Sequence, residues 1–577
     1  MNLQADRHQV AEALEEIAVL LELKGENPFK VRAYSAGART LESVDGDLGS
    51  LMSSGRLWEM KGIGAALKEK ITELAQTGKL VYLEKLRKEF PETLFDLLKV
   101  QGLGPKKVKV LYEELGIESL EQLEKACREN RLLKLAGFGQ KTQEKVLKGI
   151  EFLHTASGRY LYGDVIDTAE GILHKMKKWK EIERVSLGGS LRRGKEMVKD
   201  VDIVAASTKP QAVMDKFVAM PGVVQVLAHG ETKSSVILGK GLQCDLRVVT
   251  DKEFPYALHH FTGSKEHNTA MRTRAKETGF KMNEYGLFKG EKLVPCNDEA
   301  AIFKALGLAY IPPELREDNG EIEAAERGKI PELIELGDLR GFFHVHSTYS
   351  DGRNTLAEMV AAAAEMDIEY IGISEHSQTA FYAGGLKEAD IDRQFTELDH
   401  LQKKYPKLRI FRGVESDILP DGSLDYPDRV LKNFDFVIGS VHASFNMPEE
   451  EMTKRCVRAL ENPYCTILGH PTGRLLLNRE AFKIDLHAII DRAANLGKIV
   501  ELNANPYRLD LDWRVVGYAK EKRVRLAIDP DAHDTKGLSD IRFGINMARK
   551  GGLTKRDVFN TLPVAAMEKA LAQTRTH

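Results

Sequence analysis

The spacing of hydrophobic and polar residues changes along the chain and divides it into three kinds of region. In the first 150 residues, apolar residues recur at helical spacing, as in residues 10–17, and helix breakers recur at Gly25 and Pro28. Farther along, short apolar runs such as VDIVAA and LQCDLRVVT indicate strands. In the last third such runs alternate with helical patterns, which is typical of parallel strands joined by crossover helices. The pattern predicts a multidomain chain with α+β and α/β parts.

Bulk composition narrows the class of protein without naming a partner. The chain has 577 residues, 42% hydrophobic and 29% charged, which is ordinary for a soluble protein of about three to five domains. It contains no run of about 18 apolar residues and no apolar export signal, so we expect no membrane association. Five cysteines without a CxxC pair indicate a reducing, cytoplasmic location. The net charge of −2 neither supports nor excludes nucleic acid.

One glycine-containing pattern occurs three times in the helical region, in MKGIGAALKEKI, VQGLGPKKVKVL and LAGFGQKTQEKV. Glycine permits a sharp turn, and the free N–H groups at the start of the following helix are a ready site for phosphate oxygens. A single such pair is usually a plain turn, whereas three pairs spaced 40 and 35 residues apart indicate a shared function. The pairs are Gly62/Gly64, Gly102/Gly104 and Gly137/Gly139.

Three aspartates in the middle of the chain predict a divalent-metal site. Asp200 and Asp202 are two residues apart on one apolar run, so a strand directs both side chains to one face. Asp245 lies on a later apolar run that can pair alongside. Two ions held by such carboxylates stabilise the attacking and leaving oxygens in phosphoryl transfer. The nearby Gly-Gly-Ser turn and Arg193 offer donors to a triphosphate.

In the last third, histidines and carboxylates follow one apolar run after another. In a parallel barrel the residues just after each strand converge on one face, which carries the chemistry. Zinc and manganese sites take roughly four to six ligands each, so this set suggests two or three ions. Scattered polar residues would not recur after six apolar runs in sequence order. The candidate ligands are His344, His346, Asp351, His376, Glu415, His442, His470, Asp531 and His533.

These nine positions resemble the PHP (polymerase and histidinol phosphatase) domain, over roughly residues 340–577. The resemblance implies a distorted (β/α)7 barrel that hydrolyses phosphoesters with two to three Mn²⁺ or Zn²⁺ ions. It assigns one ion to His344, His346, Glu415 and Asp531, a second to Glu415, His442 and His470, and a third to Asp351, His376 and His533. Glu415 would bridge the first two ions.

The segments GGSLRRGKEMVKDVDIVAAS and HHFTGSKEHNTAMRTRAKETGFKMNEYGLF resemble family X DNA polymerases, and the likeness extends over most of residues 1–315. It implies that Asp200, Asp202 and Asp245 hold catalytic Mg²⁺ or Mn²⁺, with Asp245 as the base nearest the primer 3′-hydroxyl. It implies nucleotide contacts from Gly189, Ser190, Arg193, Phe261, Thr262, Gly263, Asn268 and Arg272. Three positions depart from the family pattern: His260 stands for a tyrosine, Gln243 for an arginine and Lys265 for an acidic residue.

The glycine pairs resemble helix-hairpin-helix motifs, which grip the DNA backbone without reading sequence and use a monovalent cation. The stretch from NPFKVRAYSAGARTL to GIGAALKEKI also resembles the lyase domain of DNA polymerase beta, where a lysine attacks an abasic sugar. Lys70 occupies that position, but Ala66 replaces a second lysine of the same pocket. We therefore favour Lys70 as a DNA-phosphate contact and keep the lyase nucleophile as the alternative.

The resemblances imply a domain order. We expect a lyase-like helical DNA-binding domain at 1–90, fingers at 91–155, a palm at 156–250, a thumb at 251–315, a Pro-rich and charged linker at 316–339 and the PHP domain at 340–577. The expected function is a monomeric DNA-directed DNA polymerase that fills short gaps in DNA repair, with dNTP and gapped or primer-template DNA as partners. The PHP domain would add a 3′–5′ exonuclease and an AP-endonuclease side activity.

Two alternatives come from other functional classes. A small-molecule phosphatase acting on a histidinol-phosphate-like substrate would need neither the hairpins nor the Asp200–Asp202 core. A non-catalytic DNA-binding scaffold would not need intact ligand sets at both sites. A primer that is extended or shortened by the purified protein discriminates among the three.

Overall fold

The computed structural model describes residues 4–5, 7–43, 48–60, 62–91, 93–100, 102–156 and 158–575. It divides into two compact units, Met1–Ser157 and Gly158–His577. Each unit has its own buried hydrophobic cluster.

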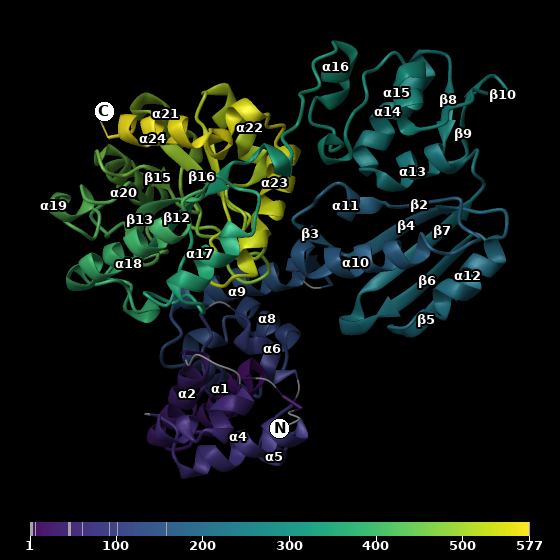
Figure 1. Cartoon of the computed structure of the whole chain (residues 1–577). Helices are drawn as coiled ribbons and strands as arrows, with labels where there is room; N and C mark the ends of the chain where they lie inside the picture. Colours follow the sequence, from purple (N-terminus) through teal and green to yellow (C-terminus); the bar gives the residue numbers. More distant parts are fainter. Residues whose placement is uncertain are drawn as a thin grey trace. The chain divides into compact units, whose positions relative to one another are not determined.

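The first unit is helical in its described residues and carries the three hairpins (Figure 1). Leucine, isoleucine and alanine side chains recur at helical spacing and form its core, where Leu14 and Ile17, for example, are fully buried. The three helices that follow the hairpins each begin one residue after the second glycine. The helices are α1 (Arg7–Lys24), α2 (Pro28–Ser43), α3 (Leu48–Ser53), α4 (Ala65–Thr77), α5 (Val81–Arg87), α6 (Leu94–Leu98), α7 (Pro105–Leu115), α8 (Leu120–Arg128) and α9 (Gln140–Ala156).

The second unit opens with a five-stranded mixed sheet in the order β2-β4-β7-β6-β5. Its strands are β2 (Arg184–Leu187), β4 (Asp200–Ala206), β5 (Val223–His229), β6 (Lys233–Leu238) and β7 (Gln243–Val249). The helices α10 (Tyr162–Met176) and α12 (Pro210–Val218) pack on the face that carries Val201, Ile203 and Ala205. A short pair, β1 (Tyr160–Leu161) and β3 (Met197–Val198), and the short helix α11 (Gly189–Arg192) complete this palm.

The opposite face of the palm sheet is only partly covered. Val204 and Ala206 on this face pack against α13 (Phe254–Thr262). Because strand side chains alternate, Asp200 and Asp202 lie on the same face as these two residues, at the other end of β4. The sheet therefore places the carboxylates beside α13, on a face where they remain half-exposed.

The thumb follows α13 and has its own small core. It comprises α14 (Lys265–Glu277), α15 (Glu299–Ala305), α16 (Glu321–Glu326) and an antiparallel sheet of β8 (Lys281–Asn283), β9 (Gly286–Lys289) and β10 (Lys292–Leu293). Met271, Leu287 and Phe303 are buried at its centre.

The structure differs from the predicted linker at 316–339. Arg316 is fully buried and forms an ion pair with Glu299 at 2.5 Å, and Ala325 of α16 belongs to the thumb core. The charged composition suggested exposure, but a buried carboxylate neutralises the buried guanidinium. The first part of this segment therefore packs as part of the thumb.

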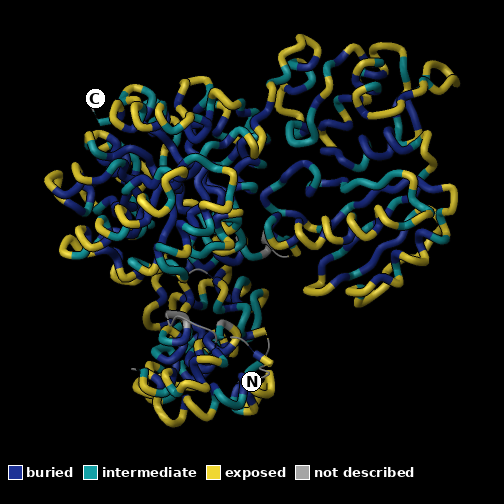
Figure 2. The backbone as a smooth tube through the Cα atoms, viewed as in Figure 1, coloured by how far each residue is buried: buried dark blue, intermediate teal, exposed yellow. Residues whose placement is uncertain are grey.

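The C-terminal part is a seven-stranded, all-parallel sheet whose strands follow one another in sequence order, and it confirms the predicted (β/α)7 barrel. The strands are β11 (Gly341–Phe342), β12 (Tyr370–His376), β13 (Arg409–Asp417), β14 (Phe436–Ser440), β15 (Ile467–Leu468), β16 (Ile499–Asn503) and β17 (Leu526–Asp529). A parallel bridge between Val345 and Ala532 brings the two edges together, so the barrel is nearly closed. Figure 2 shows the strands as buried and the surrounding helices with exposed outer faces.

The barrel helices connect successive strands or cover the barrel ends. They are α17 (Leu356–Ala364), α18 (Ile391–Lys404), α19 (Asp428–Leu431), α20 (Glu449–Glu461), α21 (Leu486–Leu496), α22 (Trp513–Glu521), α23 (Ile541–Lys550) and α24 (Val564–Gln573). None of the helices in the described ranges has the length and apolar character needed to cross a bilayer.

Candidate metal and nucleic-acid sites

The palm brings the three predicted aspartates together through strand pairing. β4 and β7 are parallel neighbours, and Asp202 is the register partner of Asp245. The turn before α11 packs against the same site: the N–H of Gly188 donates to the Asp202 carbonyl at 2.8 Å. Gly189 has φ +59°, and a side chain there would collide with the Asp202 carboxylate. Glycine at position 189 is thus required by the close approach of the turn to a metal-ligand candidate.

The three carboxylates lie close together, and this crowding favours the binding of cations. Burial, together with the neighbouring Asp200 and Asp245, raises the pKa of Asp202 to about 7. Burial and Asp245 also raise the pKa of Asp200. A divalent cation would relieve this repulsion, so the donor set fits the Mg²⁺ or Mn²⁺ implied by the sequence.

Lys233 is a site residue that the sequence did not reveal. Its ammonium on β6 pairs with Asp245 at 2.7 Å, and the Gln243 side-chain amide donates to the same carboxylate at 2.9 Å. Burial would raise the pKa of Asp245, but the hydrogen bonds from Lys233, Gln243 and Ser235 outweigh it and lower that pKa. Only the strand order places Lys233 beside Asp245, so no local motif could have signalled it.

The predicted nucleotide contacts lie around the junction of palm and thumb. A Cβ on Gly188 would lie 3.3 Å from the Phe261 carbonyl, and one on Gly263 would lie 3.1 Å from Arg193 Nη1. These short distances place Arg193 and the end of α13 beside the Gly188–Gly189 turn, which contacts Asp202. Asn268 Nδ2 donates to the His260 carbonyl at 2.7 Å, and Arg272 Nε donates to the Asn268 carbonyl at 3.2 Å, so these two contacts form one chain along α14.

Arg193 is held by partners that the sequence did not predict. Its Nε pairs with Glu317 at 3.0 Å, and its Nη1 donates to the Thr262 carbonyl at 2.5 Å. Glu317 falls in the segment predicted to be a linker, so its role is visible only once that segment folds back.

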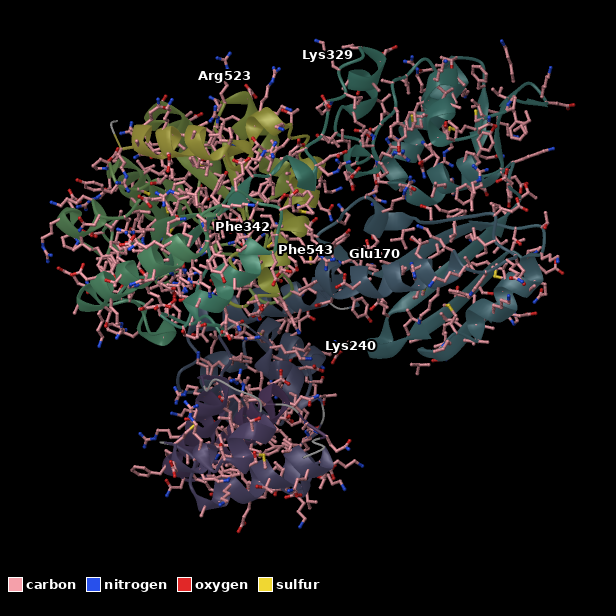
Figure 3. The ribbon with its side chains drawn as sticks, viewed as in Figure 1. Glu170, Lys240, Lys329, Phe342, Arg523 and Phe543 are labelled. Carbon is pink, nitrogen blue, oxygen red and sulfur yellow. The ribbon has the colours of Figure 1, made fainter. Side chains whose placement is uncertain are left out.

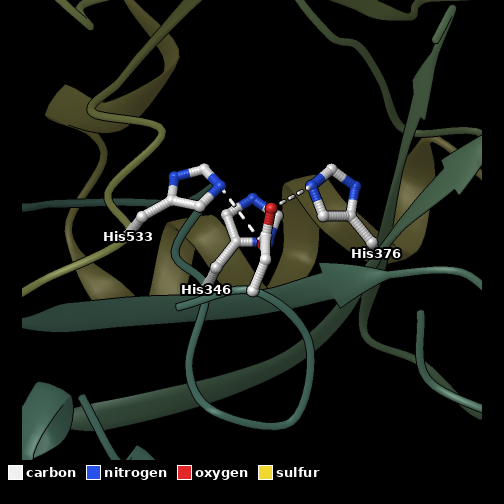
Figure 4. A group of neighbouring side chains, drawn as sticks. His346, His376 and His533 are labelled. Atoms are coloured by element: carbon white, nitrogen blue, oxygen red, sulfur yellow. Dashed lines mark ion pairs between the residues drawn. The ribbon is translucent and has the colours of Figure 1, made fainter. Parts of the chain in front are cut away.

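In the barrel, the nine predicted ligands converge at the carboxyl ends of the strands. They form four overlapping groups whose ligand atoms lie within 4.8 Å of one another. The groups are His346, Asp351, His376 and His533; His344, Glu415 and His470; His344, His346 and Asp531; and His376, Glu415 and His442. Figure 4 shows His346, His376 and His533 of the first group converging from separate segments.

Glu415 lies at the centre of the cluster. One of its oxygens is 2.9 Å from His470 Nε2 and 3.2 Å from His344 Nε2, and the other is 2.8 Å from His376 Nδ1. Burial would raise the pKa of Glu415, but the surrounding imidazoles, His344 foremost, hold it well below its usual value. A carboxylate that faces several imidazoles with both oxygens is suited to bridge two ions.

Several buried nitrogen and oxygen atoms in this cluster lie close to one another but have no partner in hydrogen-bonding geometry among the described residues. They include Nε2 of His344, both ring nitrogens of His346 and Oε2 of Glu415. Buried polar atoms are normally satisfied, and here they point into a set of imidazoles and carboxylates. The donor set therefore fits divalent metal ions.

A second layer of carboxylates orients the imidazoles and was not predicted from the sequence. Glu501 on β16 accepts from the His470 N–H at 2.5 Å and from Nδ1 of His344. Asp417, two residues after Glu415, lies 2.7 Å from Nδ1 of His442. Such partners set the tautomer and the direction of a metal-binding imidazole. An acidic residue inside the apolar run IVELN was the available signal for Glu501.

Two further polar residues line the barrel site. Arg508 Nε is 3.2 Å from Asp531, and the ring of Tyr382 lies 6.1 Å from the His376 ring and 6.3 Å from the His442 ring. Tyr382 is 70% exposed, so it stands at the mouth of the metal cluster.

The three hairpins share one backbone conformation. The first glycine of each has positive φ: +102° at Gly62, +90° at Gly102 and +83° at Gly137. The second glycines, which include Gly64 and Gly104, do not, and no described atom lies within 4 Å of a Cβ built on them. The fold requires glycine at the first position but not at the second. An open backbone beside a helix N-terminus matches the predicted phosphate contact.

Comparison with known proteins matches each part of this arrangement. Family models match for a Helix-hairpin-helix domain at residues 5–80, a SAM-like Helix-hairpin-helix tandem at 94–151, the DNA polymerase beta thumb at 257–317 and the PHP domain at 343–505. A Bacillus subtilis (strain 168) protein described as DNA polymerase/3′-5′ exonuclease PolX is 40% identical over 569 residues, covering 98% of this chain and 99% of that protein. The chain belongs to the PolX family.

Other relatives match a smaller part of the chain. Probable phosphatase TTE1963 of Caldanaerobacter subterraneus subsp. tengcongensis is 28% identical over 235 residues, which cover 38% of this chain and 85% of that protein. Probable phosphatase Teth514_1060 of Thermoanaerobacter sp. (strain X514) is 27% identical over 230 residues, covering 38% of this chain and 89% of that protein. Neither accounts for the palm and the hairpins together with the barrel.

The structure shows the surroundings of two residues, Gln243 and His260, at which this PolX-family chain departs from the family X pattern. Gln243 has no charge to offer Asp245, but Lys233 supplies one from the neighbouring strand. His260 packs edge-on against Phe261 with ring centroids 5.0 Å apart, and burial lowers its pKa.

Lys70 lies beside aromatic rings in the first unit of this PolX-family chain. Its ammonium is 4.8 Å from the Tyr82 ring, and Lys30 is 6.0 Å from the same ring. Tyr34 stacks on Tyr82 at 6.3 Å. Two cations on one aromatic surface suit a phosphate contact, the interpretation we favour for Lys70.

Proposed function

We propose that this chain is a DNA-directed DNA polymerase that fills short gaps in DNA repair and that its barrel removes nucleotides from DNA 3′ ends. The observation that carries the polymerase assignment is the register that sets Asp202 opposite Asp245 beside the Gly189 turn. Family membership supports both activities, since the Bacillus subtilis relative is described by both.

In the polymerase site, Asp200, Asp202 and Asp245 would hold Mg²⁺ or Mn²⁺, which neutralises phosphate oxygens and stabilises the entering and leaving oxygens. On the family X resemblance we assign Asp245 as the base nearest the primer 3′-hydroxyl, and Lys233 and Gln243 hold its carboxylate in the ionised form. The remaining nucleotide contacts are the triphosphate donors Gly189, Ser190 and Arg193, the sugar-lining Phe261, Thr262 and Gly263, and the minor-groove contacts Asn268 and Arg272.

In the barrel, we assign one ion to His344, His346, Glu415 and Asp531, a second to Glu415, His442 and His470, and a third to Asp351, His376 and His533. Two to three Mn²⁺ or Zn²⁺ ions would lower the pKa of bound water and neutralise the phosphate. The grouping of His346 and His376 with Asp351 and His533 supports a third site. Arg508 beside Asp531 is positioned to meet a phosphate oxygen.

The helix-hairpin-helix family matches imply DNA as the partner. We propose that Gly62, Gly64, Gly102, Gly104, Gly137 and Gly139, with a monovalent cation and Lys70, contact the DNA backbone. We also propose that dNTP is the second substrate and that the protein is monomeric and cytoplasmic. An AP-endonuclease side activity is the last part of the proposal.

One assay tests both activities and both alternatives. A 5′-labelled primer in a gapped duplex should lengthen with Mg²⁺ and dNTP, and shorten from its 3′ end with Mn²⁺ alone. A preparation that hydrolyses a small phosphate monoester but leaves the primer unchanged would support the phosphatase instead. DNA binding without either reaction would support the scaffold.

A further inference from the structure

Residues of the barrel contact the palm at the loop that follows α11. Trp513 Nε1 of α22 donates to Glu196 at 3.2 Å, and Arg514 donates to the other oxygen of Glu196 at 3.0 Å. The palm residue Lys195 lies 5.5 Å from the Trp513 ring. Tyr162 of α10 packs edge-on against Phe543 of α23, which Figure 3 labels, with centroids 6.0 Å apart. Apolar residues of the palm and barrel belong to one contiguous buried cluster.

Lys550, at the end of α23, is a further barrel residue at this contact, and it reaches both the palm and the thumb. Its side chain is fully buried, and its ammonium stands 4.6 Å from the Trp513 ring. It donates to Glu317 Oε1 at 2.5 Å, to the Arg193 carbonyl at 3.2 Å and to the Glu314 carbonyl at 3.3 Å. One barrel lysine thus binds the backbone of a palm residue and the side chain of a thumb residue.

The same carboxylate oxygen also holds the Arg193 side chain. Glu317 Oε1 lies 3.0 Å from Arg193 Nε and 2.5 Å from Lys550 Nζ, and its other oxygen lies 3.6 Å from Lys195. Burial would raise the pKa of Glu317, but Lys550 and Arg193 outweigh it and lower that pKa. Three cations around one carboxylate leave a net positive charge beside the Gly189 turn, where a triphosphate would be favoured.

We infer that Lys550 is a positioning residue of the polymerase nucleotide site: it holds Glu317 and the Arg193 backbone, so the nuclease barrel builds part of the triphosphate-binding surface. Without Lys550, Glu317 would lose one of its three cationic partners, and its ion pair with Arg193 would become stronger. The Arg193 guanidinium would then be less available to a triphosphate, and local positive charge would fall by one. This inference rests on the proposed polymerase function.

The test is steady-state gap filling by the full chain at pH 7, where Lys550 is charged because burial lowers its pKa only to about 8. Lys550→Met keeps the aliphatic chain over Trp513 and removes the charge. We expect the KM for dNTP to rise about three- to tenfold while kcat stays within about twofold. Exonuclease rate and barrel metal content should stay at wild-type values.

Lys498→Met is the matched control. Lys498 is also a buried barrel lysine that donates to carbonyls, at Pro463 and Thr574, and both of these partners belong to the barrel. Its loss should leave the KM for dNTP unchanged. An equal rise in KM in both variants would mean that any barrel damage weakens nucleotide binding, and would overturn the inference.

A double-mutant cycle is a second, independent test of the positioning role of Lys550. Glu317→Gln removes the carboxylate that competes for Arg193, so Lys550→Met combined with Glu317→Gln should have a lower KM for dNTP than Lys550→Met alone, because both residues act through one network. A double variant that keeps the full rise in KM of Lys550→Met, or an unchanged KM in Lys550→Met, would overturn the positioning role. Should Lys550→Met be insoluble, Lys550→Gln removes the same charge but keeps a donor for the Arg193 and Glu314 carbonyls, and a rise in KM in the same direction is expected. A wild-type protein that extends no primer would instead refute the proposed function.

Discussion

Asp202 and Asp245 are direct register partners on the parallel strands β4 and β7, yet their carboxyl groups are held in opposite electrostatic states. Burial, Asp200 and Asp245 raise the pKa of Asp202 to about 7, whereas the bonds from Lys233, Gln243 and Ser235 overcome burial and lower the pKa of Asp245. The site therefore has one carboxylate stabilised by protein donors and one that needs a cation.

This asymmetry predicts a pH-dependent gain of stability in Asp202→Asn. The folded-state pKa of Asp202 is raised above its unfolded value, so its ionisation costs stability as pH rises from about 4 to about 7. In metal-free protein, Asp202→Asn should raise the free energy of unfolding by roughly 1–3 kcal/mol at pH 8 and by about a third of that at pH 5. Thermal unfolding in chelator at both pH values measures this. Equal stability of the two proteins at pH 8 would contradict the pKa shift.

The polymerase and nuclease sites should be separable by mutation. Asp200→Ala or Asp202→Ala should abolish nucleotide addition, by about a thousandfold or more, because each removes a ligand of the polymerase ions. Exonuclease activity should remain, since the nine barrel ligands are untouched. Primer extension by either variant at near wild-type rate would refute the assignment.

The second hairpin glycines should affect DNA binding without affecting the fold. Gly104 has φ −87° as the N-cap of α7, and no described atom lies within 4 Å of a Cβ built there. Gly104→Val should therefore leave the Tm near the wild-type value while weakening binding to gapped duplex by about five- to tenfold. The loss should be similar for all template sequences, because phosphate contacts carry no base information directly.

Two variants serve as controls for this experiment. Gly102→Val places a side chain at φ +90° and should lower the Tm as well as the affinity. Gly171→Val changes a palm glycine that also has open space around it, and DNA affinity should be unchanged. A template-dependent loss in Gly104→Val would show that the hairpin reads bases.

The sequence predicted those features that recur within short segments. The D-x-D spacing, the repeated glycine pairs and the ligands after successive strands each depend on residues near one another in the chain. The structure brings the aspartates and the barrel ligands together, and it gives the first glycine of each hairpin a positive φ. Residues that act across strands or domains were missed. Lys233 reaches Asp245 only through the β6–β7 pairing, and Glu501 reaches His344 across the barrel.

The same limit explains the segment predicted to be a linker. Its charge and its prolines suggested solvent exposure, but Arg316 is buried on Glu299 and Glu317 pairs with Arg193 and Lys550. Buried ion pairs between distant segments have no periodic signature in a sequence. Charge composition therefore fails where each charge has a partner elsewhere in the fold.

The bridging role of Glu415 gives the last prediction. Glu415 is fully buried and contacts His344, His376, His442 and His470, so its loss should disturb two ions at once. Removing its charge leaves neighbouring cations to repel each other in a buried site. Glu415→Gln keeps the shape but offers a neutral amide, a poor bridge between cations. It should lose more than one bound ion per chain and nearly all exonuclease activity, while gap filling persists through Asp200, Asp202 and Asp245. Elemental analysis beside both assays decides this, and full metal occupancy with full nuclease activity in Glu415→Gln would refute the shared-ligand arrangement.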